Sequence, residues 1–216
     1  MDAITIHDVV EGMSVVIDTV IENEIYFSEL DSAAGDGDFG SSLAKGFREV
    51  KSEWDNLDTN DIGVFMKSCS MIIMDKCGGA SGPIWGTAFR QAGNYAKGKK
   101  QLDLDELASF FYAMVDGVKK VGGADLGDKT LLDAFIPAAE ALRTSAAAHD
   151  NILTALKKCV KAAEDGANNT KQISARKGRA SYLGERSIGY YDAGAKAVAV
   201  ILATVVEKMS NKRSSA

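Results

Sequence analysis

Residues 5–40 read TIHDVVEGMSVVIDTVIENEIYFSELDSAAGDGDFG, an amphipathic stretch that ends in a segment rich in Gly and Asp. Apolar side chains recur at spacings of three and four from Ile6 to Val20, which is the period of an α-helix with one buried face. The pattern predicts one long helix over about 5–27, followed by a loop over 31–40. The same alternation of helical pattern and loop continues towards the C-terminus.

Apolar periodicity and capping residues predict the remaining helices. Asn60, Asp103 and Asp150 are the expected N-caps of three of them, and Pro83 suits the first turn of a fourth. The expected helices cover about 41–54, then start near 60, 83 and 103, and finally cover 130–147, 150–168 and 192–209. No convincing strand is present, so the sequence predicts an all-α fold of about eight helices in a single domain, 1–216.

Four unusual loops follow the first, third, fifth and seventh expected helices. They are the Gly/Asp loop 31–40, the glycine loop 78–82, a second Gly/Asp loop at 122–128 and a basic segment at 171–191. In an up-and-down bundle of antiparallel helices, the loops after odd-numbered helices emerge at one end. Because scaffolds commonly carry function on loops that they hold together, we expect a site at this end.

Composition disfavours several classes of function. A net charge of -5 argues against a nucleic-acid binder. Two histidines and three cysteines, with no CxxC pair, are too few for a zinc site and give no Ser-His-Asp or Cys-His device. The N-terminus has no signal-peptide pattern, and no run of about 18 apolar residues predicts a membrane span. Cys69 and Cys77 lie in or beside an apolar run and are interpreted as buried thiols, which favours a reducing compartment, so we expect a cytoplasmic protein.

Asp31, Asp36 and Asp38 form the main candidate site. Glycines let their loop fold tightly enough to bring three carboxylates together, and such carboxylates repel one another unless a cation joins them. Magnesium or calcium suits these oxygens, but an EF-hand is excluded because Ser41 and Phe47 stand where Gly and Glu are required. Magnesium usually completes its shell with water and substrate phosphates. The free N–H groups of the helix that starts near Ser41 would face the same phosphates. The alternative is that Asp36 and Asp38 only cap that helix.

Two other segments are weaker candidates. The small residues at 78–82 permit close approach of a ligand, with Ser81 as a donor to phosphate, or they serve only helix packing and a glycine C-cap. The segment 171–186 is rich in Lys and Arg and could neutralise phosphates, or it could be an ordinary solvated loop. Asp192 is first interpreted as an N-cap. The stretch 127–130 is not a P-loop, because Asp128 breaks the motif and no strand precedes it.

Four blocks of sequence occur together in one known family. The blocks are LDSAAGDGDFGSSLAKGF (30–47), GGASGPIWGTAF (78–89), GDKTLLDAFIPA (127–138) and ARKGRASYLGERSIGYYDAGA (175–195). In this order they resemble the DhaL family, the nucleotide-binding subunit or domain of dihydroxyacetone kinases. The resemblance covers nearly the whole chain.

The resemblance implies an up-and-down barrel of eight antiparallel helices with the nucleotide at one end. It implies that Asp31, Asp36 and Asp38 coordinate two magnesium ions that bridge the nucleotide phosphates. The nucleotide contacts that it implies are Phe39, Gly40, Ser41, Ser42, Ala80, Ser81, Gly122, Leu131, Arg179, Asp192, Ala193 and Gly194. The sequence departs from the family pattern at Phe39, where histidine is usual, and at Leu126 and Ala193, where proline is frequent.

The resemblance also implies an activity and partners. Phosphoryl transfer would run from magnesium-bound ADP/ATP to dihydroxyacetone held on a separate DhaK-type subunit, and a DhaM-type protein of the phosphotransferase system would recharge the ADP. A homodimer is possible, and neither nucleic acid nor membrane is an expected partner. No catalytic side chain is expected, because positioning and charge neutralisation suffice for this chemistry. The alternatives are an ATP-dependent kinase subunit for a related triose or tetrose, and a regulatory nucleotide-binding module without catalysis.

Overall fold

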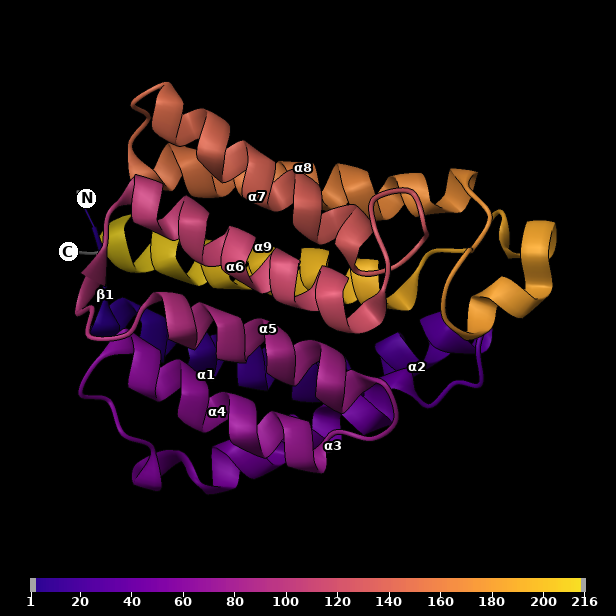
Figure 1. Ribbon diagram of the computed structural model, residues 1–216, viewed down its shortest axis with the longest axis horizontal. Coiled ribbons are helices and arrows are strands. Elements are labelled where there is room, and N and C mark those ends of the chain that lie inside the picture. Colours follow the sequence, from indigo (N-terminus) through magenta and orange to yellow (C-terminus); the bar gives the residue numbers. More distant parts are fainter. Residues whose placement is uncertain (1–2, 215–216) are drawn as a thin grey trace.

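A ring of antiparallel helices is the main feature of the computed structural model, which describes residues 3–214 (Figure 1). Its α-helices are α1 (Ile6–Glu22), α2 (Glu24–Ser32), α3 (Phe39–Ser52), α4 (Ile62–Lys76), α5 (Ser81–Tyr95), α6 (Leu104–Gly122), α7 (Leu132–Ala147), α8 (Ile152–Asn169) and α9 (Ala193–Ser214). The short 3-10 helices are η1 (Trp54–Asn56), η2 (Thr170–Gln172) and η3 (Arg179–Ser187). One antiparallel pair of two-residue strands, β1 (Ile4–Thr5) and β2 (Gln101–Leu102), is the only sheet within 3–214. The all-α prediction is confirmed.

The ring closes between the first and the last helix. α1 packs against α3 and α9, and from α3 to α9 each helix packs against the next one along the chain. α2 lies at one end of the ring, in contact with α3 and α9. Buried apolar side chains from all of these helices share one core. If α1 and α2 are counted together, this is the expected eight-helix up-and-down barrel.

The prediction of one helix over 5–27 was wrong, because the helix breaks at Asn23. Asn23 has φ −97° and ψ 13°, and its side-chain amide donates to the carbonyl oxygen of Thr19 at 2.8 Å. An Asn side chain that bonds to nearby backbone competes with continuation of the helix. The second segment, α2, then runs on to Ser32. Asp31 therefore lies in the last turn of a helix, and the loop begins two residues later than the sequence predicted.

Two of the expected N-caps are off by one residue. α4 is capped by Asp61, not Asn60, and the Asp61 carboxylate accepts from the Val64 N–H at 2.9 Å. α8 is capped by Asn151, not Asp150. Neighbouring residues with similar capping ability cannot be ranked by residue type alone. Which of them becomes the N-cap depends on the register of the first helical turn.

The N-cap of α6 is as expected, and it forms a capping box. The Asp103 carboxylate accepts from the Glu106 N–H at 2.8 Å, and the Glu106 carboxylate accepts from the Asp103 N–H at 3.1 Å. We expect Asp103→Ala to lower the free energy of unfolding by about 1 kcal/mol, because it leaves a helix N–H without its partner. Urea denaturation measures this change. Asp116→Ala in the exposed middle of the same helix is the control, and an equal loss there would contradict the capping role.

The burial of the cysteines tests one expectation from the sequence. Cys69, Cys77 and Cys159 are buried and free, and burial raises the pKa of their thiols to about 12, 11 and 12. The prediction of buried thiols at Cys69 and Cys77 is thus confirmed.

Over residues 3–214, no helix combines the length and the hydropathy that a bilayer span requires.

The four unusual loops meet at one end of the ring, as predicted. The loop after α2, the loop after α4, the 123–131 loop after α6 and the 170–192 segment after α8 all contribute to the wall of one cavity. In Figure 1 this end lies on the right, whereas both ends of the chain lie on the left.

Candidate functional site

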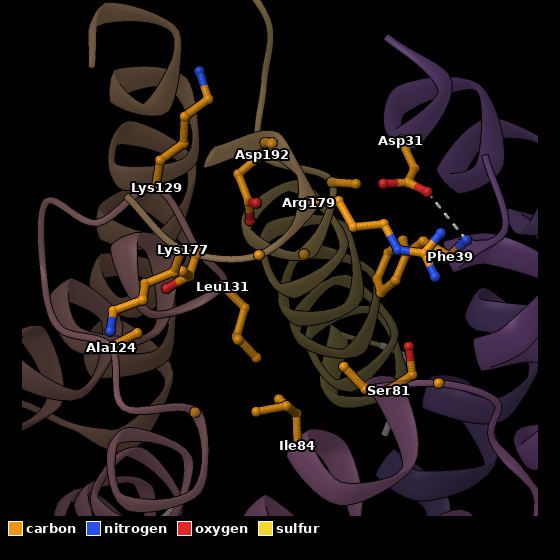
Figure 2. Close-up of a pocket in the computed structure, with 18 of the residues that line it drawn as sticks. Asp31, Phe39, Ser81, Ile84, Ala124, Lys129, Leu131, Lys177, Arg179 and Asp192 are labelled. Carbon is orange, nitrogen blue, oxygen red and sulfur yellow. Dashed lines mark hydrogen bonds between the residues drawn. The ribbon is translucent and has the colours of Figure 1, made fainter. Parts of the chain in front are cut away.

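The cavity at the loop end has a volume of about 570 Å³, which is in the usual range for small-molecule sites. Its wall is built from the ends of α2 and α6 and the starts of α3, α5, α7 and α9, together with the loops that follow α2, α4, α6 and α8. Figure 2 shows Asp31, Phe39, Ser81 and Arg179 on one side, with Ala124 and Lys177 on the other. A closed ring that holds these six helix ends in place therefore supplies a preformed binding cavity.

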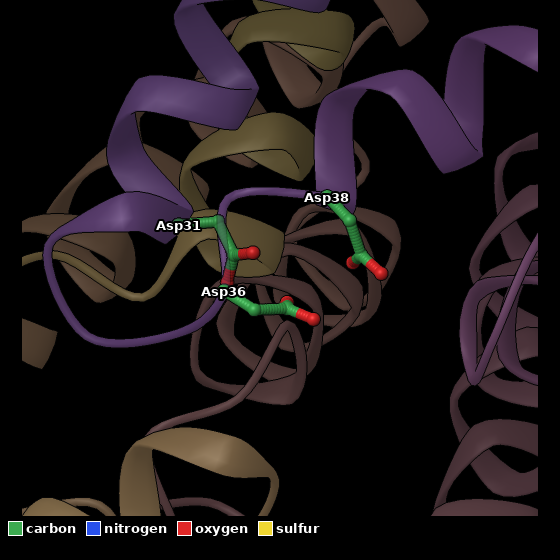
Figure 3. A group of neighbouring side chains, drawn as sticks. All are labelled: Asp31, Asp36 and Asp38. Atoms are coloured by element: carbon green, nitrogen blue, oxygen red, sulfur yellow. The ribbon is translucent and has the colours of Figure 1, made fainter.

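Three carboxylates converge at one side of this cavity. Asp31, Asp36 and Asp38 each offer one oxygen, and these oxygens all lie within 4.8 Å of one another (Figure 3). The Asp31 carboxylate also accepts from the N–H groups of Gly37 at 2.9 Å and Phe39 at 3.4 Å. Gly37 has φ +77°, a conformation that other residues rarely adopt. The tight loop that the glycines predicted thus forms around Asp31.

The alternative, in which Asp38 serves only as a helix cap, is confirmed for its position but not for its side chain. Asp38 occupies the N-cap position of α3, but its side chain makes no capping hydrogen bond and its backbone has φ −93° and ψ −8°. Its carboxylate is exposed at the cavity together with that of Asp36. The two acidic groups are therefore free to act on something other than the helix.

A positive group lies among the carboxylates. The guanidinium of Arg179 forms an ion pair with Asp36, and its second nitrogen lies 3.9 Å from the Asp38 carboxylate. Such a contact offsets the repulsion of carboxylates held close together. Hard oxygen ligands in a tight loop also suit a divalent cation such as magnesium, which binds through few carboxylates. The donor set fits that ion, and Arg179 lies where a cation is favoured.

The glycine loop serves both helix packing and the cavity. A Cβ at Gly82 would lie 2.9 Å from the carbonyl oxygens of Cys77 and Met74, so only glycine fits between the end of α4 and the start of α5. Close packing, which the sequence offered as the alternative, is therefore present. At the same time Ala80 and Ser81 line the cavity beside the carboxylates.

An apolar area adjoins the charged side. Ile84 from α5, Val118 and Val121 from α6, and Leu131 line this part of the cavity. Figure 2 shows Ile84 and Leu131 between the Ser81 side and the Ala124 side. A charged cluster beside an apolar wall suits a ligand with an anionic part and a flat apolar part.

Asp192 both caps α9 and borders the cavity. Its carboxylate accepts from the Ala195 N–H at 2.7 Å, which confirms the N-cap interpretation. Desolvation, together with repulsion from Asp133 and Asp31, raises the pKa of Asp192 to about 7. Ala193 also lines the cavity at this point. The protonation of Asp192 at the start of α9 is therefore influenced by Asp31 of the acidic cluster.

The cavity gathers most of the residues that the sequence singled out. Those that line it are Asp31, Asp36, Asp38, Phe39, Ala80, Ser81, Gly122, Leu131, Arg179, Asp192, Ala193 and Gly194. Their ligand contacts stay predictions. Phe39, which replaces the usual histidine, has its ring centroid 6.2 Å from that of Phe27, so it packs as an apolar residue.

Gly40, Ser41 and Ser42 are not part of the cavity wall. A Cβ at Gly40 would overlap the carbonyl oxygen of Glu24, which shows how closely α3 approaches α2. The Ser41 hydroxyl donates to the Asp38 carbonyl at 2.9 Å, and the Ser42 carbonyl accepts from the Gly78 N–H at 3.4 Å. These residues shape the loops, and their predicted nucleotide contacts stay predictions.

Three buried residues at or beside the site were not expected from the sequence. Trp85 is 8% exposed and lines the cavity. The buried Asp133 carboxylate accepts from the N–H groups of Gly127 and Thr130, each at 2.7 Å. The third residue, Lys129, is 2% exposed. The spacing of Asp133 from Thr130 is a recognisable turn signal, but nothing in the sequence marks a buried lysine.

The fold and the site define an all-α domain with a cavity of small-molecule size beside three convergent carboxylates. Comparison with known proteins gives the family: the model of the DAK2 domain matches residues 33–207. The chain belongs to the DAK2 domain family.

Curated relatives match most of this chain. The PEP-dependent dihydroxyacetone kinase, ADP-binding subunit DhaL, of Escherichia coli (strain K12) is 40% identical over 173 residues, which are 80% of this chain and 82% of that protein. The corresponding subunit of kinase 2 from Listeria innocua serovar 6a is 37% identical over 211 residues, 97% of this chain and 96% of that protein. Both relatives are therefore similar to this chain over more than four fifths of their length.

Solved structures support the same assignment. The dihydroxyacetone kinase of C. freundii in its native form matches with a TM-score of 0.73 and 26% identity over 93% of this chain. The same kinase in complex with AMP-PNP and Mg²⁺ matches with a TM-score of 0.71 and 27% identity over 92% of this chain. The chain spans about a third of the length of that kinase, 34% and 33% in the two structures.

Proposed function

We propose that this chain is, as a single domain, the nucleotide-binding subunit of a dihydroxyacetone kinase. One observation carries the proposal: three convergent carboxylates face a cavity that also has an apolar wall. The carboxylates suit a metal–phosphate group and the wall suits a purine. Support comes from the relatives named as ADP-binding subunits, one of which the chain covers to 96%.

Asp31, Asp36 and Asp38 are the proposed ligands of two magnesium ions. Bound there, magnesium would bridge nucleotide phosphate oxygens and offset the charge that develops on the transferred phosphoryl group. Ala80 and Ser81 would face the phosphates from the same side of the cavity as the carboxylates. Arg179, paired with Asp36 and Asp38, has an exposed side chain that would contact phosphate instead when a nucleotide is bound.

Leu131 and Gly122 are the proposed neighbours of the base. They adjoin the apolar wall formed by Ile84 and Val121, which offers area for a flat ring. Over residues 3–214, the cavity lining includes no histidine. The proposed work of this chain is therefore to position the nucleotide and neutralise its charge, which is the main contribution of proteins to phosphoryl transfer.

The acceptor and the phosphate donor would be held elsewhere. We propose a DhaK-type subunit that carries dihydroxyacetone and a DhaM-type protein that recharges bound ADP, in the cytoplasm. The names of the relatives, which describe PEP-dependent kinases with separate ADP-binding subunits, support this division of labour. A homodimer of this chain is compatible with the proposal.

The first test is native mass spectrometry of the purified chain, followed by denaturation to identify released small molecules. We expect ADP and magnesium to be retained, and EDTA to release both. The chain is then mixed with a DhaK-type subunit, dihydroxyacetone and a phosphorylated DhaM-type protein, and formation of dihydroxyacetone phosphate is measured. Rapid exchange of ATP in place of retained ADP would favour an ATP-dependent kinase subunit. Nucleotide binding without any sugar phosphate would favour a regulatory module, and no nucleotide binding would refute the proposal.

A further inference from the structure

Lys129 is buried with its charged end surrounded by backbone oxygens. Its ammonium nitrogen lies 2.8 Å from the carbonyl oxygen of Thr170, 3.1 Å from that of Ile173, 2.6 Å from that of Ser187 and 2.8 Å from that of Tyr190. All four acceptors belong to the segment 170–190, which the chain reaches only after the whole of α7 and α8. The Lys129 side chain therefore forms hydrogen bonds with both ends of that segment.

The surroundings of Lys129 are those of a bound monovalent cation. An ammonium group has three N–H donors and here meets four carbonyl oxygens, as a desolvated potassium ion does in protein sites. Desolvation lowers the pKa of Lys129, and the carboxylates of Asp192 and Asp133 oppose that change. A buried charge is costly unless it is fully paired, so this arrangement stabilises the fold only while the carbonyls stay in place.

The backbone at Lys129 is also specialised. Its φ is +61°, a left-handed conformation that is uncommon for a residue with a side chain. The Asp133 carboxylate fixes the chain on both sides through the Gly127 and Thr130 N–H groups. In Figure 2 the ammonium end points away from Leu131 and Ala124 and so away from the apolar wall. Such strained positions persist where the surroundings determine them, and they are frequent at functional sites.

The anchored segment carries the basic side of the cavity. Lys177, Gly178, Arg179 and Ala180 line the cavity from the middle of this segment. Further bonds hold this segment as well: the Arg176 N–H donates to the Asp128 carbonyl at 3.1 Å, the Gly189 N–H to the Lys171 carbonyl at 2.8 Å and the Ala175 N–H to the Ser187 hydroxyl at 2.8 Å. Holding the two ends of the segment together therefore determines where Arg179 lies relative to Asp36 and Asp38.

We propose that Lys129 is a positioning residue whose ammonium group takes the place of a structural monovalent cation. It holds the segment 170–190 so that Lys177 and Arg179 face the carboxylate side of the nucleotide site. The ligand of the site rests on the proposed function, but the anchor itself belongs to the ligand-free chain.

The test compares Lys129→Ala and Lys129→Met, which remove the charge with and without leaving space. For both variants we expect unchanged helix content by circular dichroism. Tryptic cleavage within 171–186 and hydrogen exchange of those amides should be about tenfold faster or more, because charge-assisted hydrogen bonds hold the segment closed. Affinity for magnesium ADP should fall by a similar factor. Lys157→Ala, at an exposed lysine of α8, should match the unsubstituted protein in every measurement.

Chemical rescue separates a positioning role from a general loss of stability. Potassium or methylammonium chloride should restore protection of the segment in Lys129→Ala, where the four carbonyls enclose a vacant space. The same salts should not restore it in Lys129→Met, and tetramethylammonium chloride should restore neither. Segment protection that stays unchanged in both variants, or no rescue of the Ala variant, would overturn the proposal.

A measurement on the unsubstituted protein covers the case in which the variants do not fold. Acylation of lysines, followed by mass spectrometry, should label Lys129 only at the rate at which the amides of 170–190 exchange. Labelling as fast as that of exposed lysines such as Lys157 would refute the anchor. Both protection measurements are made without nucleotide, so their outcome is distinguishable from a failure of the proposed function.

Discussion

Asp36→Ala is expected to abolish magnesium-dependent binding of ADP. Asp36 supplies one of three oxygens that lie within 4.8 Å of one another, and no other carboxylate joins that group within the described residues. Loss of an outer-shell partner typically weakens metal binding about 10–100-fold, so loss of a direct ligand should weaken it by about 100-fold or more. Isothermal titration with ADP, in magnesium and in EDTA, measures the effect.

The stability of the Asp36→Ala protein should hardly change. The ion pair between Asp36 and Arg179 is largely exposed, and exposed pairs contribute about 0–1 kcal/mol. Lost binding would therefore reflect a lost ligand and not an unfolded chain, which a thermal melt verifies. Asp116→Ala, on the exposed face of α6, is the matched control. Affinity that is equal in the Asp36→Ala and Asp116→Ala proteins would refute the metal assignment.

Gly40→Ala should destabilise the fold and the site together. A Cβ at this position would overlap the Glu24 carbonyl oxygen and lie 2.6 Å from the Ser28 hydroxyl, so α2 and α3 must move apart. Overpacking of this kind costs about 1–3 kcal/mol of unfolding free energy. Because α2 ends beside Asp31 and α3 starts beside Asp38, the same shift should also weaken magnesium ADP binding.

Gly12→Ala provides the opposite case with the same change of residue. Gly12 lies inside α1, and the nearest side-chain atom to its Cβ would be 3.8 Å away, on Val205. Alanine there should raise the free energy of unfolding by about 0.5–1 kcal/mol, since glycine is unfavourable inside a helix. Urea denaturation compares the two. If the Gly40→Ala protein is as stable as the Gly12→Ala protein, Gly40 is not needed for the close approach of α2 and α3.

The parts of the site that the sequence predicted are those with a local cause. The glycines next to Asp36 and Asp38 favour a tight loop. Asp192 is a residue type that caps helices by accepting from the N–H group three residues later, here that of Ala195. These effects involve residues close in the chain. The one-residue displacements at Asp61 and Asn151 and the break at Asn23 show the limit, because there several local choices have nearly equal energy.

The parts that could not be predicted depend on long-range contacts. Lys129 bonds to carbonyls that follow it by 41 to 61 residues, and lysine is normally an exposed residue. Gly40 looks like a loop glycine, yet its role is set by α2, which approaches only in the folded chain. The apolar wall at Ile84 and Val121 likewise joins two helices whose alignment the periodicity alone does not fix.

The closure of the ring between α1 and α9 has a consequence for how the chain folds. Apart from the contacts of α1 and α2 with α9, the helix contacts around the ring join neighbours or near neighbours along the chain, so those pairs can form while the protein is still being synthesised. The α1–α9 seam, with an ion pair between Glu11 and Lys212, cannot form until the last helix has left the ribosome. The apolar side chains of α1 that face α9 therefore stay uncovered, and open to chaperones and to aggregation, until synthesis reaches the last helix.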